Sequence, residues 1–496
     1  MSINDLLILF PEIMVIVTGL SILIIDLFVS NKRILPLVTV LGLFTALLFL
    51  IYQMSSGLTI DESSLLNSAI VFDQFGMLYK FIIIFCSLSI IIGSTGFTKS
   101  FNKFSSEFYA LMLFSTSGMM FLSSASELIF LYLSIELTTL PLIALSAIHK
   151  TSKSTESSLK FLILAAVSSA ILLYGIVLLY GLTGTTDIQL ISSTLTDLFK
   201  NGETEYIPIA LIIITLIVTG FGFKISAVPF QMWTPDVYEG APIPITTFLS
   251  VASKTAAFAA LIRISTLIFP NLSQDISWGQ VIAIISALSM TVGNFSAILQ
   301  NSFKRMMAYS TIAHAGYLLI GISAISVGVS DLITNSISTM TFYLIGYCLI
   351  NMTAFISVMC ILNTIENDSI KKLSGLGKSS PMIAFCLAIS MVALTGLPPT
   401  IGFIGKLYLF SVGFDSGFDW LVLIALLNSV IAAYYYLRVV KVMYLETSSK
   451  SKVFNVSLMP KITILSLTIF IILFGVIPGP IVDITMNAAE SISIFR

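Results

Sequence analysis

Charged residues are scarce in this sequence, and their scarcity indicates the class of protein. Only 10% of the 496 residues are charged, whereas 57% are hydrophobic and the mean hydropathy is +1.02. Such a composition is typical of an integral membrane protein rather than a soluble globule, and no stretch reads as a separate soluble domain. The net charge of −1 argues against nucleic acid as a partner, because phosphate binding requires a basic surface.

Cysteine and histidine are also sparse, with four and two copies. The cysteines lie singly inside apolar runs, without the Cys-x-x-Cys spacing of metal or redox sites, and we interpret them as packing residues: Cys86, Cys348, Cys360 and Cys386. The sequence also lacks a Walker loop, a Gly-x-Gly-x-x-Gly motif after a strand and an acidic metal pair. These absences argue against ATP hydrolysis or a redox centre in this chain by itself. An energy source other than an ion gradient must therefore come from a partner.

Long hydrophobic runs, by contrast, fill the chain. A bilayer-spanning helix needs about 20 mostly apolar residues. Fourteen windows qualify, at residues 5–28, 35–53, 75–95, 107–124, 126–148, 158–182, 207–237, 243–268, 279–299, 303–325, 334–361, 381–413, 420–445 and 461–485. The first lacks the basic start and cleavage motif of a signal peptide, so we expect a retained span. The sequence predicts an all-α polytopic membrane protein with about 14 transmembrane helices.

The orientation follows from the lysines and arginines between these windows. Counted on alternate sides, sixteen fall on one side and only four on the other, namely Lys80, Lys200, Arg263 and Arg496. The positive-inside rule makes the richer side the inner one. With an even number of spans, both termini are expected on the outer side.

Two windows are interrupted by proline. The window 207–237 would measure about 46 Å as one helix, too long for a hydrocarbon core of about 30 Å unless it tilts or breaks. We expect Pro229 and Pro235 to break it, and Pro398 and Pro399 to break the window 381–413.

These interruptions suggest an internal repeat. The window 207–237 is the fourth of five spans within residues 107–268, and the window 381–413 is the fourth of five within 279–446. Because five is odd, the second unit enters the membrane from the opposite face, which is the inverted-repeat arrangement of transporters. Residues 1–106 supply three preceding helices, and 461–485 one final helix.

Six of the ionisable residues inside predicted spans are candidates for function: Glu136, Lys160, Lys224, Lys254, His314 and Lys406. A charge near the bilayer centre costs about 2.5–3.5 kcal/mol or more, so such residues are functional candidates. Hydrocarbon favours their uncharged forms, which makes them able to exchange protons near neutral pH. Lys160 lies only three residues into its window and could instead snorkel to the interface. A histidine by itself would more often be a hydrogen-bonded core residue than a functional one.

Four motifs resemble a known family. They are the segment 222–242 (GFKISAVPFQMWTPDVYEGAP), Ser253-Lys254, the segment 304–310 (KRMMAYS) and the segment 402–406 (GFIGK). Together with the whole-chain pattern, they resemble subunit N (chain 2) of respiratory complex I, the NADH:quinone oxidoreductase. Sister antiporter-like subunits typically carry Trp-Leu-Pro-Asp-Ala where this chain has WTPDV at 233–237. The fourteen spans resemble bacterial, archaeal, plastid and most non-animal mitochondrial forms.

The resemblance implies a membrane-arm subunit that moves protons while partner subunits oxidise NADH and reduce quinone. All six intramembrane residues fall on the family's proton-translocation positions. The resemblance also implies that this chain binds no cofactor and that NADH, FMN, iron–sulfur clusters and quinone belong to partner subunits. Neighbouring antiporter-like subunits and the bilayer are the expected surroundings. The expected location is an energy-transducing membrane, either the prokaryotic cell membrane or the mitochondrial inner membrane.

Three alternatives remain open. The chain could belong to a multisubunit sodium/proton antiporter, which would purify without flavin and iron–sulfur partners. It could belong to a ferredoxin-dependent or other donor-dependent relative of complex I. It could also be a scaffold that bridges neighbouring subunits without pumping, in which case substitution of Lys224 would leave pumping intact.

Overall fold

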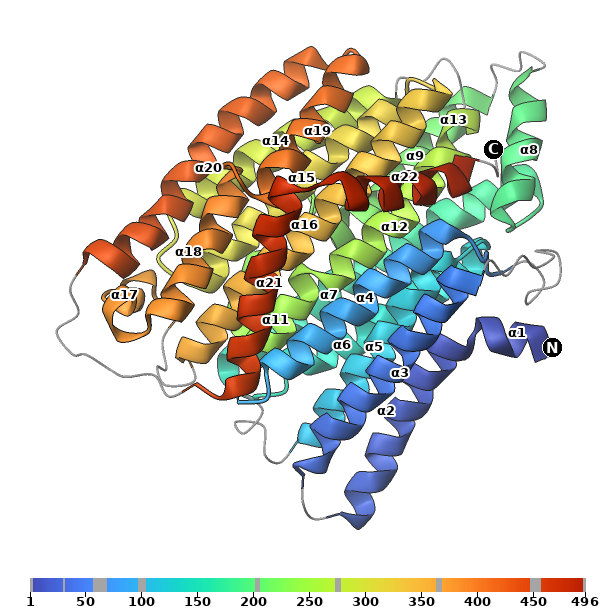
Figure 1. The fold of residues 1–496 in the computed structure, drawn as a ribbon. Coiled ribbons are helices and arrows are strands. Elements are labelled where there is room, and N and C mark those ends of the chain that lie inside the picture. Colours follow the sequence, from blue (N-terminus) through green and yellow to red (C-terminus); the bar gives the residue numbers. More distant parts are fainter. Residues whose placement is uncertain are drawn as a thin grey trace.

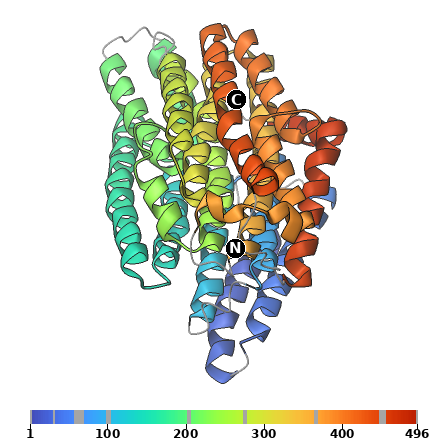
Figure 2. The ribbon, with the colours of Figure 1, turned by 90° about the vertical axis from the view of Figure 1, so that its left-hand side faces the viewer.

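The computed structural model describes residues 3–29, 32–56, 69–96, 104–200, 206–272, 278–362, 368–446 and 456–493. Within these ranges the chain is helical, with three isolated β-bridges and no strand. The long helices run side by side in one bundle (Figure 1, Figure 2). A backbone in hydrocarbon must satisfy its own hydrogen bonds, and helices do so within each segment. The predicted all-α membrane fold is confirmed.

The first half of the chain contains the N-terminal helices and the first predicted repeat. The N-terminal helices are α1 (Ile3–Ile8), α2 (Phe10–Phe28), α3 (Ile34–Ser56) and α4 (Gln74–Gly93). The first repeat contains α5 (Ser105–Ser124), α6 (Leu128–Ser146), α7 (Ser152–Thr183), α8 (Ile188–Lys200), α9 (Ile207–Ile225), α10 (Trp233–Gly240), α11 (Ile243–Ser250), α12 (Ala252–Leu267) and α13 (Phe269–Leu272).

The second half contains the second predicted repeat and the C-terminal helices. The repeat contains α14 (Trp278–Ile298), α15 (Phe303–Ile325), α16 (Ser330–Leu362), the 3₁₀ helix η4 (Ile370–Leu373), α17 (Leu376–Ser379), α18 (Pro381–Thr395), α19 (Ile401–Asp415) and α20 (Asp419–Leu445). The chain continues with α21 (Leu458–Val476) and α22 (Gly479–Ser493), and α22 lies crosswise to the bundle (Figure 1).

Twelve helices among the described residues are long and apolar enough to cross a membrane. Two of the fourteen predicted windows lack such a helix. The serine-rich α5 is mostly buried inside the bundle, and the window 381–413 is divided into two 15-residue helices. The count of fourteen therefore stays a prediction. The last window also differs, since its helix ends at Val476 and the chain turns into α22 after Pro478.

Both predicted interruptions exist, with one correction. Pro229 lies between α9 and α10, and Pro398 and Pro399 lie between α18 and α19. Pro235, however, is the third residue of α10 and does not break it. The first turn of a helix has no acceptor for a backbone N–H, so proline is tolerated there. A further division, at Val251 between α11 and α12, has no proline and was not predicted.

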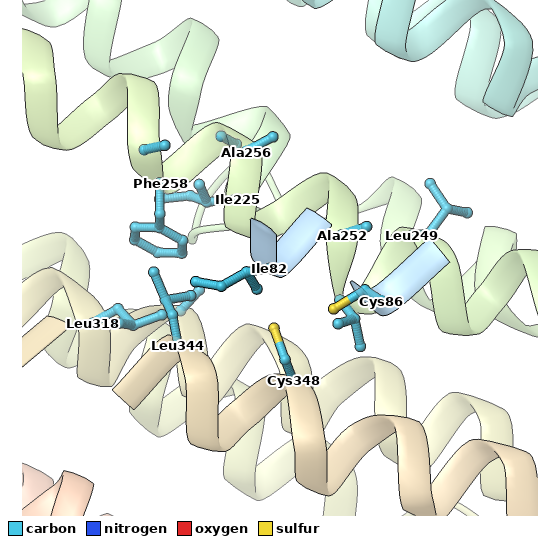
Figure 3. Close-up of a cluster of buried hydrophobic side chains, with 14 of the residues drawn as sticks. Ile82, Cys86, Ile225, Leu249, Ala252, Ala256, Phe258, Leu318, Leu344 and Cys348 are labelled. Carbon is cyan, nitrogen blue, oxygen red and sulfur yellow. The ribbon is translucent and has the colours of Figure 1, made fainter. Parts of the chain in front are cut away.

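The first three of the four predicted units share one hydrophobic core. Figure 3 shows Ile82 and Cys86 of α4 beside Ala252 of α12 and Leu344 of α16, near Ile225 at the end of α9. These side chains all belong to one buried cluster. Helix α4, which precedes the first predicted repeat, is therefore part of the bundle and contributes to its core.

Small residues bring α14 and α15 into backbone contact. A Cβ added at Gly316 would lie 2.8 Å from the Met290 amide nitrogen, and one at Gly293 would lie 2.7 Å from that of Ala313. Glycine permits this close approach, as it does between many membrane helices. The contact fixes α15 on both sides of His314.

Candidate functional site

Glu136 is a residue of α6, and its side chain contacts α7. It is partly buried, and its carboxylate accepts a hydrogen bond from the Ser169 hydroxyl on α7. The same hydroxyl is 3.1 Å from the Tyr132 hydroxyl, one turn earlier on α6. The Glu136 carboxylate, a predicted site group, therefore lies beside polar side chains of both α6 and α7.

Lys224 is the penultimate residue of α9. Its ammonium group donates to the Thr139 hydroxyl of α6, almost one turn beyond Glu136. Glu136 attracts this ammonium electrostatically, but no direct ion pair joins the two residues in the described structure. The two predicted partners are thus neighbours that are held by separate hydroxyl groups.

Lys254 binds the end of the first broken helix. Its Nζ donates to the carbonyl oxygen of Ile225, the last residue of α9, at 2.8 Å. Ser226, which follows, has a left-handed φ of 64° that ends the helix and leaves its final carbonyls without intrahelical partners. Because the C-terminal end of a helix carries partial negative charge, it suits a cation. The Trp233 indole donates to the carbonyl of Phe223 at 2.9 Å, and the Ser226 amide donates to the same carbonyl at 3.1 Å.

Lys406 binds the end of the second broken helix in the same manner. Its Nζ donates to the carbonyls of Leu394 at 3.0 Å and Thr395 at 2.9 Å, and to the Ser429 hydroxyl of α20 at 3.0 Å. These three acceptors match the three N–H groups of a charged ammonium. The lysine comes from α19, the second half of its own broken helix, whereas Lys254 comes from the span that follows its broken helix. The two breaks thus use the same chemistry with different connectivity.

His314 lies on α15 between two tyrosines. Its Nδ1 is 2.5 Å from the Tyr343 hydroxyl of α16, and its Nε2 is 3.1 Å from the Tyr436 hydroxyl of α20. A cavity beside the second break is lined by His314, Tyr343, Tyr347 and Lys406 together with apolar side chains. The Tyr347 hydroxyl lies 3.2 Å from that of Ser250, the last residue of α11. Polar groups thus extend from the end of α11, which precedes the helix of Lys254, to Lys406.

Lys160 is the one predicted site residue that lies apart from the others. Its side chain is 47% exposed, and it pairs with Glu156 at 2.9 Å and with Asp236 of α10 at 3.0 Å. Arg305 of α15 binds both Asp236 at 3.0 Å and Glu239 at 2.7 Å. Lys160 therefore belongs to a charged cluster on α7, α10 and α15, not to the buried groups.

Glu239 anchors the same cluster beyond the first broken helix. Partial burial acts to raise the pKa of its carboxyl, but hydrogen bonds from Lys153 at 2.5 Å and from Arg305 outweigh it and hold the pKa below the usual value. The adjacent Lys304 donates to the backbone carbonyls of Glu239 and Ala241. The end of α10 is thus held by cations from α7 and α15.

Two buried ion pairs were missed by sequence reasoning. Lys80 of α4 pairs with Glu12 of α2 at 2.6 Å, and Arg263 of α12 pairs with Asp73 at 2.8 Å. All four side chains are at most 3% exposed. The charge count treats Lys80 and Arg263 as outer-side residues between spans, whereas the structure places both side chains in buried ion pairs within the bundle. The available signals were two acidic residues: Glu12 inside the apolar window 5–28, and Asp73 two residues before the window 75–95.

Among the described residues, no group of three or more histidine, cysteine, aspartate or glutamate side chains is arranged to hold a metal ion. The four cysteines are buried and free.

Comparisons with known proteins agree with this geometry. The family described as "NADH:quinone oxidoreductase/Mrp antiporter, TM" matches residues 125–432. The NADH-quinone oxidoreductase subunit N of Dehalococcoides mccartyi is 35% identical over 97% of this chain and 99% of its own. That of Trichlorobacter lovleyi is 36% identical over 98% of each chain.

Solved structures give the same fold. A chain of respiratory complex I from Thermus thermophilus with bound aureothin is 27% identical, with a TM-score of 0.79 over 95% of this chain and 98% of that one. A chain of the Mrp complex from a Dietzia species has a TM-score of 0.84 over 99% and 98%, at 19% identity, a likeness of fold alone. Fold and site thus define an antiporter-type membrane subunit. The chain belongs to the NADH-quinone oxidoreductase subunit N family.

Proposed function

We propose that this chain is a proton-translocating membrane-arm subunit of an NADH:quinone oxidoreductase and that five buried or partly buried ionisable groups carry the protons. The groups are Glu136, Lys224, Lys254, His314 and Lys406. The observation that carries the proposal is their placement: the lysines lie at two broken helix ends, and hydroxyl and carbonyl groups contact every member. Broken helices of this kind form the ion sites of transporters.

The energetics favour several groups acting together. Moving one proton against 100 mV costs about 2.3 kcal/mol. Two unit charges about 10 Å apart interact by about 1.7 kcal/mol at an effective dielectric of about 20. The energy of one change in charge pairing is therefore smaller than the cost of moving one proton. Coupled changes at several groups supply the remaining energy.

The exposure of Glu136 supports a neighbouring membrane subunit on this face. The carboxylate is partly exposed at membrane depth, beside Leu133 and Leu140, which are 57% and 55% exposed. A charge facing lipid there would be costly. A partner subunit that covers α6 and α7 removes this cost.

We place Lys160 on the inner side, where its cluster with Asp236 and Arg305 would deliver protons toward the buried groups. The distribution of charge supports this orientation. Lys80 and Arg263, two of the four basic residues assigned to the outer side, lie in buried ion pairs and carry little topological information. Without these two residues, the excess of lysine and arginine on the inner side is larger. Both termini are therefore placed on the outer side. The location is a prokaryotic cell membrane, with the mitochondrial inner membrane as the alternative.

The complete enzyme would act as a translocase, with NADH, FMN, iron–sulfur clusters and quinone bound by partner subunits. A sodium/proton antiporter is the second candidate, because the Mrp chain shares the fold. A ferredoxin-dependent relative is the third. Purification in mild detergent separates these functions, since only the first yields flavin and iron–sulfur subunits together with NADH oxidation.

Substitution of Lys224 tests the proton-transfer role. Arginine keeps the charge but cannot release a proton near neutral pH, whereas alanine removes both. We expect Lys224→Arg to reduce proton uptake per electron in reconstituted vesicles nearly as much as Lys224→Ala. The same changes at the exposed Lys441 of α20 serve as controls and should have no effect. An active Lys224→Arg variant would show that Lys224 is only a fixed counter-charge and would move the exchange role to Lys254.

A further inference from the structure

Two of the four cysteines meet in the shared core, although each lies singly in the sequence. Cys86 belongs to α4 and Cys348 to α16, and both side chains are at most 2% exposed. Figure 3 shows their sulfur atoms pointing toward one another. The Cys86 thiol forms a hydrogen bond with the Cys348 side chain. The two residues come from the first and second halves of the chain, so no local spacing could reveal the pair.

A hydroxyl of a third helix completes this group. The Thr255 Oγ1 atom of α12 lies 3.2 Å from the Cys348 sulfur. Thr255 donates its own proton to the Val251 carbonyl at 2.9 Å, so its oxygen accepts the proton of the Cys348 thiol. The Cys348 sulfur in turn accepts the proton of Cys86. Two sulfur atoms and one hydroxyl oxygen, from three helices, therefore form one continuous set of contacts.

The other two cysteines have different surroundings. Cys386 of α18 forms a hydrogen bond with the Thr468 hydroxyl of α21, and Cys360 of α16 is affected by the charge of Lys461. In the part of the chain that the structure describes, neither of them contacts a second thiol. The chain thus contains one pair of thiols in contact and two separate thiols, which serve as internal controls.

The surroundings of the pair select the kind of ligand that it can hold. The side chains drawn around the two sulfur atoms are apolar, among them Ile82, Leu249 and Ala252 (Figure 3). An unbalanced charge is costly in such a place. A divalent cation bound by two thiolates is neutral overall, whereas a monovalent cation would leave one negative charge. Soft metals favour thiolate ligands, and zinc ordinarily takes four ligands where this group offers three.

We propose that Cys86 and Cys348 form a binding site for a soft divalent metal cation that two sulfur ligands satisfy, with mercuric ion as its type. In the step, two S–H bonds break, two bonds between sulfur and the metal form, and two protons leave to the solvent. No electron is transferred. The bound ion joins α4 to α16 and so links the N-terminal helices to the second predicted repeat. This site is independent of the proposed function.

Metal retention by the full chain in detergent tests the proposal. Cys360→Ser and Cys386→Ser together leave the pair as the only thiols. After one equivalent of mercuric chloride and a wash with a monothiol, we expect native mass spectrometry to show one retained mercury ion per chain. Two thiols held together compete better for the ion than separate ones. The ion should also raise the thermal midpoint by about 3 °C or more, because it binds the folded state.

The matched control also has two thiols, but in separate places. Cys86→Ser with Cys348→Ser keeps Cys360 and Cys386, and we expect the wash to remove its mercury and the midpoint to stay unchanged. Adding Cys86→Ser alone to the first variant should have the same effect. Equal retention by the paired and the separate thiols would overturn the proposal. Without metal, the thermal midpoints of all these variants show whether each one folds.

The natural chain provides a second measurement that needs no variant. It is treated with one equivalent of mercuric chloride, denatured and alkylated, and each cysteine is then assigned by peptide mass spectrometry. We expect Cys86 and Cys348 to be protected together, while Cys360 and Cys386 are alkylated. Protection of Cys360 or Cys386 in place of the pair would contradict the proposal.

Discussion

Buried lysines in this protein are stabilised in three different ways. Lys80 has a carboxylate partner, Lys224 has a hydroxyl and a nearby carboxylate, and Lys254 and Lys406 have the carbonyls of interrupted helices. A carbonyl at a helix end attracts a cation without itself binding a proton. Lysines held in this way can lose and regain a proton without transferring it to their partner. The pair of Lys80 and Glu12 has no such freedom, and we interpret it as structural.

A double substitution separates these roles. Glu12→Gln leaves the Lys80 charge buried without its partner, which typically costs about 3–5 kcal/mol. We expect this variant to assemble poorly, with a lower thermal midpoint in detergent. Combined Glu12→Met and Lys80→Met replaces the pair by apolar groups of similar size and should recover most stability and normal proton uptake. A stable double variant without pumping would instead place this pair in the proton path.

At the scale of helices, the function depends on where helices stop. α9 ends at a left-handed serine, and α18 ends before a left-handed glycine, Gly396. Each ending exposes carbonyls in the interior, and each is followed by a short loop that contains proline. A continuous helix would use those carbonyls internally and leave the lysines without acceptors.

The second break is supported by another helix. A Cβ added at Gly475 of α21 would lie 2.4 Å from the carbonyl carbon of Thr400 and 2.5 Å from the Pro399 oxygen. We therefore expect Gly475→Ala to push α21 from the break, to destabilise the subunit by about 1–3 kcal/mol and to reduce proton uptake. Gly479→Ala is the control, because a Cβ there meets no atom within 4 Å. Thermal unfolding in detergent and uptake in vesicles measure both effects, and equal behaviour of the two variants would contradict the expectation.

At the scale of the whole molecule, distant segments are tied together at one end of the bundle. Asp73 begins α4, accepts a hydrogen bond from the Gly76 amide at 2.7 Å and pairs with Arg263 of α12. The neighbouring Phe75 amide donates to Ser491 of α22 at 3.1 Å. α22 also contacts α16 through Thr485 and Ser338, whose hydroxyls are 3.0 Å apart. The crosswise helix α22 thus joins α4, one of the N-terminal helices, to α16 of the predicted second repeat.

This arrangement allows a direct test of orientation. Asp483 lies on the exposed face of α22, and Lys372 is exposed on η4. We expect Asp483→Cys to react with a membrane-impermeant maleimide from the outer side of sealed vesicles, and Lys372→Cys only from the inner side. The native cysteines are buried, so background labelling should be low. The reverse pattern would place both termini inside.

The sequence by itself determined the properties that depend on composition and local chain geometry. Hydropathy indicated the membrane class, and the prolines located the two interrupted helices, because proline removes a backbone donor wherever it lies. Five of the six predicted ionisable residues lie within the bundle, since a charge in an apolar run is too costly to face lipid and must find polar partners among the helices.

The tertiary structure decided what each of these residues contacts. It placed Lys160 in an exposed cluster with Asp236, paired Lys80 with Glu12, and brought Tyr343 and Tyr436 to opposite sides of His314. Most of these partners lie dozens to more than a hundred residues apart in the chain. Their types are common in membrane helices, so no local pattern distinguishes them. The packing of helices alone determines which hydroxyl or carboxylate reaches a buried charge.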